Sequence, residues 1–354
     1  MIQTVRKIYN RILKENIKNS IRSRFKRTFL LIDKRIIYRE YVKACRYILK
    51  QEIFAYSGAP YGYRYAEFLA KIRTKYIKTR IMHERIEIRD SEMQKCIDFV
   101  RENEPDVYCG SLKDITIYSE QDIGYDEKNK LYYGMYEGKR LYFNSIINTK
   151  KEALQYLNGI AAEQSEHSPH RYLTEDFNVG REDIVFDIGC AEGNFALSVV
   201  DRVKEIYLFE VEDVWIRPLQ LTFAPYKDKV HIIKKCVARK TDAFAVTVDD
   251  FCREQHIKQV GMIKIDVEGY ERDVLLGAMQ MIGKGRIDKI AICTYHKVKD
   301  EEILGKLLSN YKQTMSEGYM LLALAYDTIS KIKPPYFTKG IMRAVLDKGK
   351  IHET

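Results

Sequence analysis

The sequence lacks the features that would place the chain in a special structural class. Its 354 residues include seven cysteines, an odd number, and no two of them form a Cys-x-x-Cys pair. That pattern argues against a zinc site or a disulfide framework and favours a reducing compartment. There is no run of about 18 apolar residues, which a membrane-spanning helix requires. The basic N-terminus also lacks the clustered apolar stretch of a secretory signal.

What is present is an ordinary globular composition with an uneven charge distribution. Apolar residues make up 45% and charged residues 31%, which excludes a disordered or collagen-like chain, and the length favours two domains. Residues 1–90 hold 23 Lys and Arg against 8 Asp and Glu, a net charge of +15, whereas the remainder carries −5. Such a segment is typical of binding to nucleic acid, anionic lipid or a phosphorylated substrate, and equally of a solvated helical face.

The first part of the chain is predicted to be helical. Over residues 1–57 apolar residues recur every three to five positions between Lys and Arg, which predicts a basic amphipathic segment. This segment could lie on an anionic membrane surface, bind a phosphorylated lipid carrier, or pack on the body of the protein or on a second subunit. Two further helices are expected near 63–80 and 90–102, then a β-hairpin over Lys130–Phe143 that turns at Glu137-Gly138, and a helix near 150–163.

From residue 181 onward, predicted strands and helices alternate. The expected strands are 184–188, 206–209, 230–233, 262–265 and 287–293, and the expected helices are 195–203, 213–226, 248–257, 270–282 and 301–316. Five such units with short loops predict a parallel sheet with helices on both faces. Two closing strands near 319–326 and 341–346 are expected to form a hairpin that finishes the sheet. We therefore predict a basic helical accessory region over 1–104, a hairpin and linker helix over 105–163, and an α/β domain over 164–354.

A glycine-punctuated turn follows the strand 184–188 and precedes a helix. Gly189 permits a tight turn and Gly193 a close approach of backbone to a ligand, as in Rossmann nucleotide sites. Here, however, Asp187 ends the strand, and Glu192 stands where a pyrophosphate would need room. Two carboxylates favour a cationic ligand, and S-adenosyl-L-methionine carries both a sulfonium and an ammonium group.

Three further strand ends carry candidate functional residues. Glu210 lies about 20 residues after the glycine turn, where an acid commonly binds ribose hydroxyls. Asp266 and Glu268 follow the fourth strand and are suited to binding substrate hydroxyls, acting as a base or holding a divalent metal; capping of the next helix is the structural alternative for Glu268. His296 follows the fifth strand, where a neutral imidazole suits a general base.

These stretches together resemble the FkbM family of S-adenosylmethionine-dependent methyltransferases over residues 164 to 346. The matching segments are Ser168–Tyr172, Asp187–Gly193, Thr247–Phe251, Ile263–Glu271, Thr294–Lys297 and Gly318–Met320. The resemblance implies a class I methyltransferase (Rossmann-like) seven-stranded sheet with a final antiparallel strand, preceded here by the N-terminal helical region and the small β-hairpin element. It also implies methylation of oxygen, often on the sugars of a glycan, a glycolipid or a natural product.

By the same resemblance, the cofactor S-adenosyl-L-methionine is bound around the glycine turn. The residues assigned to it are Asp187, Gly189, Cys190, Ala191, Glu192, Gly193, Phe195, Glu210, His170 and Arg171, those assigned to catalysis are His296 and Asp266, and those assigned to substrate binding are Glu268, Asp249 and Tyr295. Ala191 stands where many methyltransferases have a third glycine, but its side chain is small enough to preserve the turn. No metal is assigned.

Two other functions compete with this hypothesis. The basic segment and the many tyrosines suit a nucleic-acid methyltransferase, but no Asn/Asp-Pro-Pro-Tyr/Phe motif follows the fourth strand. A non-catalytic scaffold is disfavoured because the acidic and glycine positions are intact. The expected partners are a sugar or glycan acceptor and, through the basic segment, an anionic surface or a second copy of the chain. The expected location is the cytoplasm, including the inner face of its membrane.

Overall fold

A computed structural model describes residues 73–74, 76–84, 86–88, 90–103, 107–109, 112, 115–323 and 331–350. All of them belong to one compact unit, Tyr63–Thr354. The predicted basic helical segment over 1–57 lies outside the described residues, and so does most of the stretch predicted as helix near 63–80. In the part of the chain that is described, no helix combines the length and hydropathy needed to cross a membrane.

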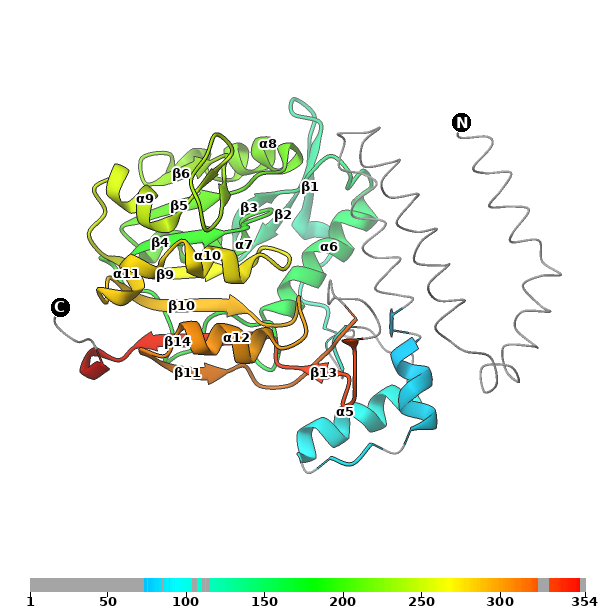
Figure 1. Ribbon diagram of the computed structural model, residues 1–354. Coiled ribbons are helices and arrows are strands. Elements are labelled where there is room, and N and C mark those ends of the chain that lie inside the picture. Colours follow the sequence, from blue (N-terminus) through cyan, green and yellow to red (C-terminus); the bar gives the residue numbers. More distant parts are fainter. Residues whose placement is uncertain are drawn as a thin grey trace, which may run out of the picture. The chain divides into compact units, whose positions relative to one another are not determined.

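The unit is built around a mixed sheet of seven strands in the order β11-β14-β10-β9-β4-β5-β6 (Figure 1). Its strands are β4 (Ile184–Ile188), β5 (Glu205–Phe209), β6 (Val230–Ile233), β9 (Val260–Ile265), β10 (Ile287–Cys293), β11 (Tyr311–Met315) and β14 (Ile341–Leu346). The first five are parallel, whereas β14 runs antiparallel to both β10 and β11. This confirms the predicted α/β, Rossmann-like, seven-stranded sheet.

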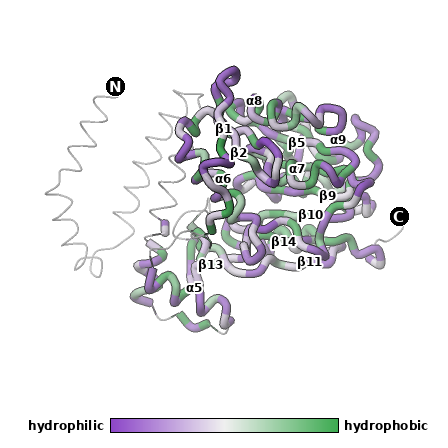
Figure 2. The backbone as a smooth tube through the Cα atoms, turned by 180° about the vertical axis from the view of Figure 1, so that it is seen from behind, coloured by the Kyte–Doolittle hydropathy of each residue, from purple (hydrophilic) through white to green (hydrophobic). Residues whose placement is uncertain are grey.

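Helices cover both faces of the sheet, as continuous apolar strands require. Residues 76–83 are helical, and the α-helices that follow are α5 (Ser91–Glu102), α6 (Lys150–Glu163), α7 (Asn194–Val199), α8 (Asp213–Thr222), α9 (Val248–Glu254), α10 (Glu271–Leu276), α11 (Met279–Gly283) and α12 (Asp300–Leu307). Short 3-10 turns are η2 (Glu120–Asp122), η3 (Val200–Arg202), η4 (Ala224–Tyr226) and η6 (Lys348–Lys350). Successive strand residues point to opposite faces. Val185 therefore belongs to the core cluster that includes residues of α6, α7 and α8, whereas Phe186 belongs to the cluster that includes residues of α9 to α12. In Figure 2, many of the outer loops and helical turns are purple, that is, hydrophilic.

A small antiparallel sheet precedes the main one. It consists of β1 (Ile123–Asp126), β2 (Leu131–Tyr136) and β3 (Lys139–Tyr142), and it contacts α6 and α8. The predicted hairpin is confirmed: β2 and β3 pair from Tyr136 and Lys139, and both turn residues, Glu137 and Gly138, have positive φ, as a two-residue hairpin turn favours. Two short pairs complete the described strands: β7 (Cys236–Val237) with β8 (Ala245–Val246), and β12 (Met320–Leu321) with β13 (Phe337–Thr338).

Two predicted elements near the C-terminus were wrong. The helix expected over 301–316 ends at Leu307, and Tyr311–Met315 forms strand β11, because the buried Tyr311 and the partly buried Met315 pair with β14. Of the closing strand expected over 319–326, Met320–Leu321 form β12, which pairs with β13 outside the main sheet, and residues 324–326 lie outside the described residues. The pair that finishes the sheet is therefore β11 and β14, and it closes the edge beside β10.

Candidate active site

The candidate residues gather where the parallel strands β4, β5, β9 and β10 end. Ile188 at the end of β4 is in register with Phe209 of β5 and Ile265 of β9, and Ile265 is in register with Ile292 of β10. Because parallel strands end at the same edge, the residues that follow each of them face one region. Ligands of open α/β sheets bind at this edge.

The turn after β4 has an unusual backbone conformation, and Glu210 links it to the end of β5 by hydrogen bonds. Gly189, Ala191 and Gly193 all have positive φ. A Cβ atom on Gly189 would lie 1.9 Å from the Asp266 carbonyl oxygen, so only glycine lets this turn pass the end of β9. The buried Glu210 carboxylate accepts hydrogen bonds from the backbone N–H groups of Ala191 (3.0 Å), Val211 (2.7 Å) and Glu212 (2.8 Å). Glu210 therefore fixes the turn and places its carboxyl group at the end of β5.

Asp187 forms an ion pair with Lys264 that was not predicted from the sequence. Its carboxylate is fully buried, and Lys264 Nζ of the neighbouring strand β9 lies 3.1 Å from Oδ1. The same ammonium donates a 2.6 Å hydrogen bond to the Gly189 carbonyl oxygen. Burial raises the pKa of Asp187 and Lys264 opposes that rise, whereas Asp187 and Asp266 raise the pKa of Lys264 against its own burial. The charge of Asp187 is thus largely neutralised within the protein.

A second network surrounds one oxygen of Asp266. Tyr172 donates a 2.7 Å hydrogen bond from its hydroxyl to Asp266 Oδ2, and His170 Nε2 lies 3.7 Å from the same oxygen. The hydroxyl of Tyr295 lies 2.9 Å from His170 Nε2. Burial lowers the pKa of His170 to about 4, so this imidazole is neutral at pH 7. The network therefore positions Asp266 through neutral, buried groups.

His296 joins the other oxygen of Asp266 to two further carboxylates. Its buried imidazole pairs through Nδ1 with Glu271 Oε1 at 2.7 Å, while Nε2 lies 3.7 Å from Asp266 Oδ1 and 3.4 Å from Glu268 Oε2. Burial disfavours the charged imidazole, but the hydrogen bond to Glu271 and the nearby carboxylates outweigh it and raise the pKa of His296 to about 9. His296 thus carries a proton at pH 7, and the neutral imidazole expected from its position after the fifth strand was wrong.

Glu271 fixes the position of His296 and was not predicted as a site residue. It is buried, and the oxygen that contacts His296 also accepts hydrogen bonds from the backbone N–H groups of Val267 (3.1 Å) and Gly269 (3.2 Å). The tight turn that permits this has positive φ at Glu268 and Gly269. The sequence gives one sign of a role for Glu271, because this residue lies only three positions after the candidate residue Glu268. An acidic residue at the start of a helix, however, is usually interpreted as a helix cap.

The remaining predicted cofactor residues lie around the same turn. Glu192 is buried and accepts a 2.6 Å hydrogen bond from the Tyr156 hydroxyl, while Cys190 and Phe195 are buried in the core beside it. Arg171 contributes its backbone carbonyl, which accepts a 2.6 Å hydrogen bond from Arg343 Nη2.

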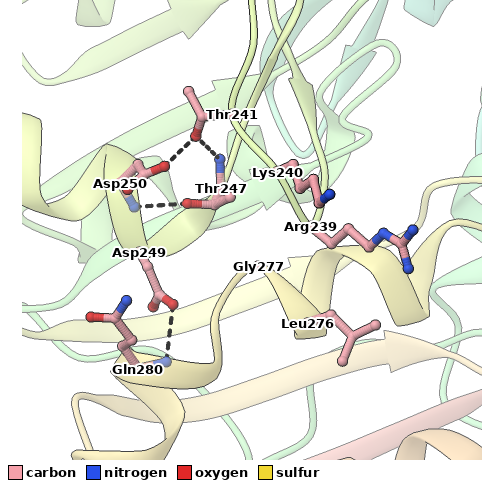
Figure 3. A pocket seen from close by; sticks show the side chains of 9 residues that line it. All are labelled: Arg239, Lys240, Thr241, Thr247, Asp249, Asp250, Leu276, Gly277 and Gln280. Carbon is pink, nitrogen blue, oxygen red and sulfur yellow. Dashed lines mark hydrogen bonds between the residues drawn. The ribbon is translucent and has the colours of Figure 1, made fainter.

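Asp249 contacts a different part of the protein. Its two carboxylate oxygens accept hydrogen bonds from the backbone N–H groups of Gln280 and Met281, both at 2.9 Å, and so cap helix α11. Figure 3 shows it in a surface pocket together with Arg239 and Lys240, and no hydrogen bond or ion pair joins it to the network around Asp266 within the described residues. The structure therefore gives Asp249 a structural partner, and its substrate-binding role stays a prediction.

Comparisons with known proteins point to methyltransferases. The family model described as the methyltransferase FkbM domain matches residues 237–314, a span that contains Lys264, Asp266, Glu268, Glu271 and His296. No curated protein matches the chain.

Three solved structures illustrate the structural similarities. A methyltransferase FkbM from Methylobacillus flagellatus KT is 15% identical, with a TM-score of 0.38, over 64% of this chain and 56% of that chain. An rRNA methylase from Streptococcus thermophilus is 16% identical, with a TM-score of 0.31, over 48% of this chain and 89% of that one. TrmK from M. capricolum, solved with S-adenosyl-homocysteine, is 12% identical, with a TM-score of 0.32, over 50% of this chain and 70% of that one. This chain thus spans little more than half the length of the FkbM structure.

Proposed function

We propose that this protein is an S-adenosylmethionine-dependent O-methyltransferase whose acceptor is a sugar hydroxyl of a glycan, a glycolipid or a natural-product precursor. The observation that carries the proposal is the convergence, at one sheet edge, of the glycine turn braced by Glu210 with the cluster of Asp266, Glu268 and His296. The family match over residues 237–314 covers this cluster and supports the reaction class.

The turn and its neighbours fit the cofactor in shape and charge. Glu210 presents a fixed carboxylate at the end of β5, suited to ribose hydroxyls, and the adjacent Val211 is an apolar side chain that is 50% exposed, suited to the face of a base. Among the described residues around the turn, Asp187, Glu192 and Asp266 supply three carboxylates, against the ammonium group of Lys264. An excess of negative charge suits a ligand with sulfonium and ammonium groups.

The chain's own residues would position an acceptor and activate its hydroxyl. S-adenosylmethionine, when bound, supplies the methyl group on its sulfonium and is left as S-adenosylhomocysteine. Glu210 and the turn over Gly189–Gly193 would hold that group. His296 would orient the hydroxyl oxygen, and the Asp266 carboxylate would accept the hydroxyl proton as that oxygen takes up the methyl group. Orientation of this kind can lower a barrier by about 7–11 kcal/mol.

The acceptor class is tested by following the label from methyl-tritiated S-adenosylmethionine. The full chain is incubated with a glycolipid and polysaccharide fraction and, separately, with total RNA from the same cells. We expect label in the glycan fraction, recovered after acid hydrolysis as an O-methyl sugar. Label confined to RNA, with binding that weakens steeply as salt rises, would overturn the sugar assignment in favour of nucleic acid.

A further inference from the structure

The carboxylate of Asp266 is held by one short hydrogen bond. Its Oδ2 atom accepts a 2.7 Å hydrogen bond from the Tyr172 hydroxyl, whereas Oδ1 is buried and receives no hydrogen bond from any described residue. His296 Nε2 lies 3.7 Å from Oδ1, beyond the usual range of about 2.7–3.2 Å for hydrogen bonds from nitrogen to oxygen. The orientation of this carboxylate therefore depends on Tyr172.

Tyr172 is itself held by contacts with several parts of the fold. It is 3% exposed, and its ring packs edge-on against the rings of His170 and Phe195, with centroids 5.1 Å and 5.7 Å apart. Its backbone N–H donates a 3.1 Å hydrogen bond to Gln164 Oε1, directly after α6. Because Phe195 belongs to the helix that follows the glycine turn, the ring is fixed relative to that turn as well as to Asp266.

Arg343 of β14 fixes the backbone of the same segment. This buried arginine donates a 3.0 Å hydrogen bond from Nε to the Tyr172 carbonyl oxygen and a 2.6 Å hydrogen bond from Nη2 to the Arg171 carbonyl oxygen. A planar guanidinium offers such donors in a fixed arrangement, which the ammonium group of a lysine does not. Strand β14 thereby holds Arg171 and Tyr172 in place beside the end of β9.

We propose that Arg343 and Tyr172 are positioning residues that orient the Asp266 carboxylate for proton transfer from the acceptor hydroxyl. Arg343 fixes the backbone of Tyr172, the packing of the ring fixes its hydroxyl, and the hydroxyl fixes Asp266 Oδ2. This role rests on the proposed function, in which the Asp266 carboxylate accepts the hydroxyl proton as the oxygen takes up the methyl group. The final antiparallel strand then contributes to the reaction without contacting the reacting atoms.

The hydrogen bond from Tyr172 also affects the charge of Asp266. Burial raises the pKa of Asp266, but Lys264, the two histidines and the Tyr172 hydroxyl together hold it well below its usual range. The titratable groups that face this carboxylate are Lys264, His170, Tyr172, Cys293, His296, Glu163 and Asp187. Removing the Tyr172 hydroxyl takes a donor away from the charged form, so the pKa of Asp266 should rise.

The test compares Tyr172→Phe and Arg343→Lys with the wild-type full chain, with methyl-tritiated S-adenosylmethionine as donor and the glycolipid and polysaccharide fraction as acceptor. At saturating S-adenosylmethionine, both variants should transfer label more slowly, by as much as about 10²-fold, with little change in KM for S-adenosylmethionine. In Tyr172→Phe, the acid limb of the rate profile should also move to higher pH, because Asp266 then loses its proton at a higher pH. The double variant should be about as slow as Tyr172→Phe alone, because both residues act through one hydrogen bond.

Tyr311→Phe is the matched control. Tyr311 and Tyr172 are both 3% exposed, and the Tyr311 hydroxyl donates a 2.8 Å hydrogen bond to the Ile287 carbonyl oxygen at the start of β10, the end remote from the site. This variant should keep the wild-type rate and the wild-type acid limb. The proposal is overturned if Tyr172→Phe matches this control in both.

A double-mutant cycle in urea tests the contact without turnover. The losses of unfolding free energy in Tyr172→Phe and Asp266→Ala should not add in the double variant, because either substitution removes the same hydrogen bond. The losses in Tyr311→Phe and Asp266→Ala should add. Additive losses in the first pair would also overturn the proposal. If the wild-type chain transfers label to no fraction, the proposed function fails, and non-additive losses still assign Tyr172 as the residue that positions Asp266.

Discussion

Replacing Lys264 with methionine is expected to lower the free energy of unfolding by about 3–5 kcal/mol, because it leaves the Asp187 carboxylate buried and unpaired. Both side chains are almost completely excluded from solvent, at 5% and 0% exposure, so water cannot replace the lost ammonium. The substitution also removes the hydrogen bond that fastens the Gly189 carbonyl. Urea denaturation measures the effect as a lower transition midpoint.

A double variant shows whether the loss comes from the unpaired charge. Lys264→Met combined with Asp187→Asn removes both charges, so it should recover much of the lost stability even though cofactor binding suffers. The control is Lys306→Met, which breaks an exposed ion pair with Glu302 one helical turn away and should change stability little. A loss for Lys264→Met no larger than for this control would contradict the assignment of a structural ion pair beneath the cofactor turn.

The second large effect is expected on turnover. His296→Ala should reduce methyl transfer by about 10²–10⁴-fold, the range typical of a group that assists proton transfer, while S-adenosylhomocysteine still binds. Cofactor binding should persist because His296 contacts Asp266, Glu268 and Glu271, which follow β9. Within the described residues, no hydrogen bond or ion pair joins His296 to the Glu210 carboxylate.

His296→Gln is the companion variant, because an amide can keep a hydrogen bond to Glu271 and so limits harm to folding. Steady-state kinetics with the acceptor found in the label experiment gives kcat and KM separately, and His231→Ala serves as the control for a histidine distant from the site. Unchanged kcat in both His296 variants would remove this residue from the mechanism.

The sheet, and the position of the candidate site at the carboxyl ends of its strands, could be predicted because the local patterns of apolar residues and glycines agree with the fold. Apolar runs such as Ile184–Ile188 and Ile287–Cys293 are buried strands, and the glycine turn, Glu210 and Asp266 come directly after strands. A parallel sheet then brings strand ends together whatever their separation in sequence. The proximity of Asp266 to His296 follows from this topology alone.

The errors occurred where local pattern and tertiary contacts disagree. Residues 311–315 continue an apparently helical stretch, but their pairing with β14 makes them a strand. Lys264 is a single charged residue within an otherwise apolar strand, which signals a buried partner without naming it as Asp187. An aspartate such as Asp249 can bind a substrate hydroxyl, but both of its carboxylate oxygens accept hydrogen bonds from backbone N–H groups at the start of α11.

The turn after β4 and the end of β5 are expected to form a site for S-adenosylmethionine. Isothermal titration of the full chain with S-adenosylhomocysteine tests it most directly, with Glu210→Ala as the site variant and Glu205→Ala as a control on the same strand. We expect one binding site per chain, which is lost in Glu210→Ala and retained in the control. The absence of binding heat together with an unchanged Tm at saturating ligand, or equal binding by Glu210→Ala, would contradict it.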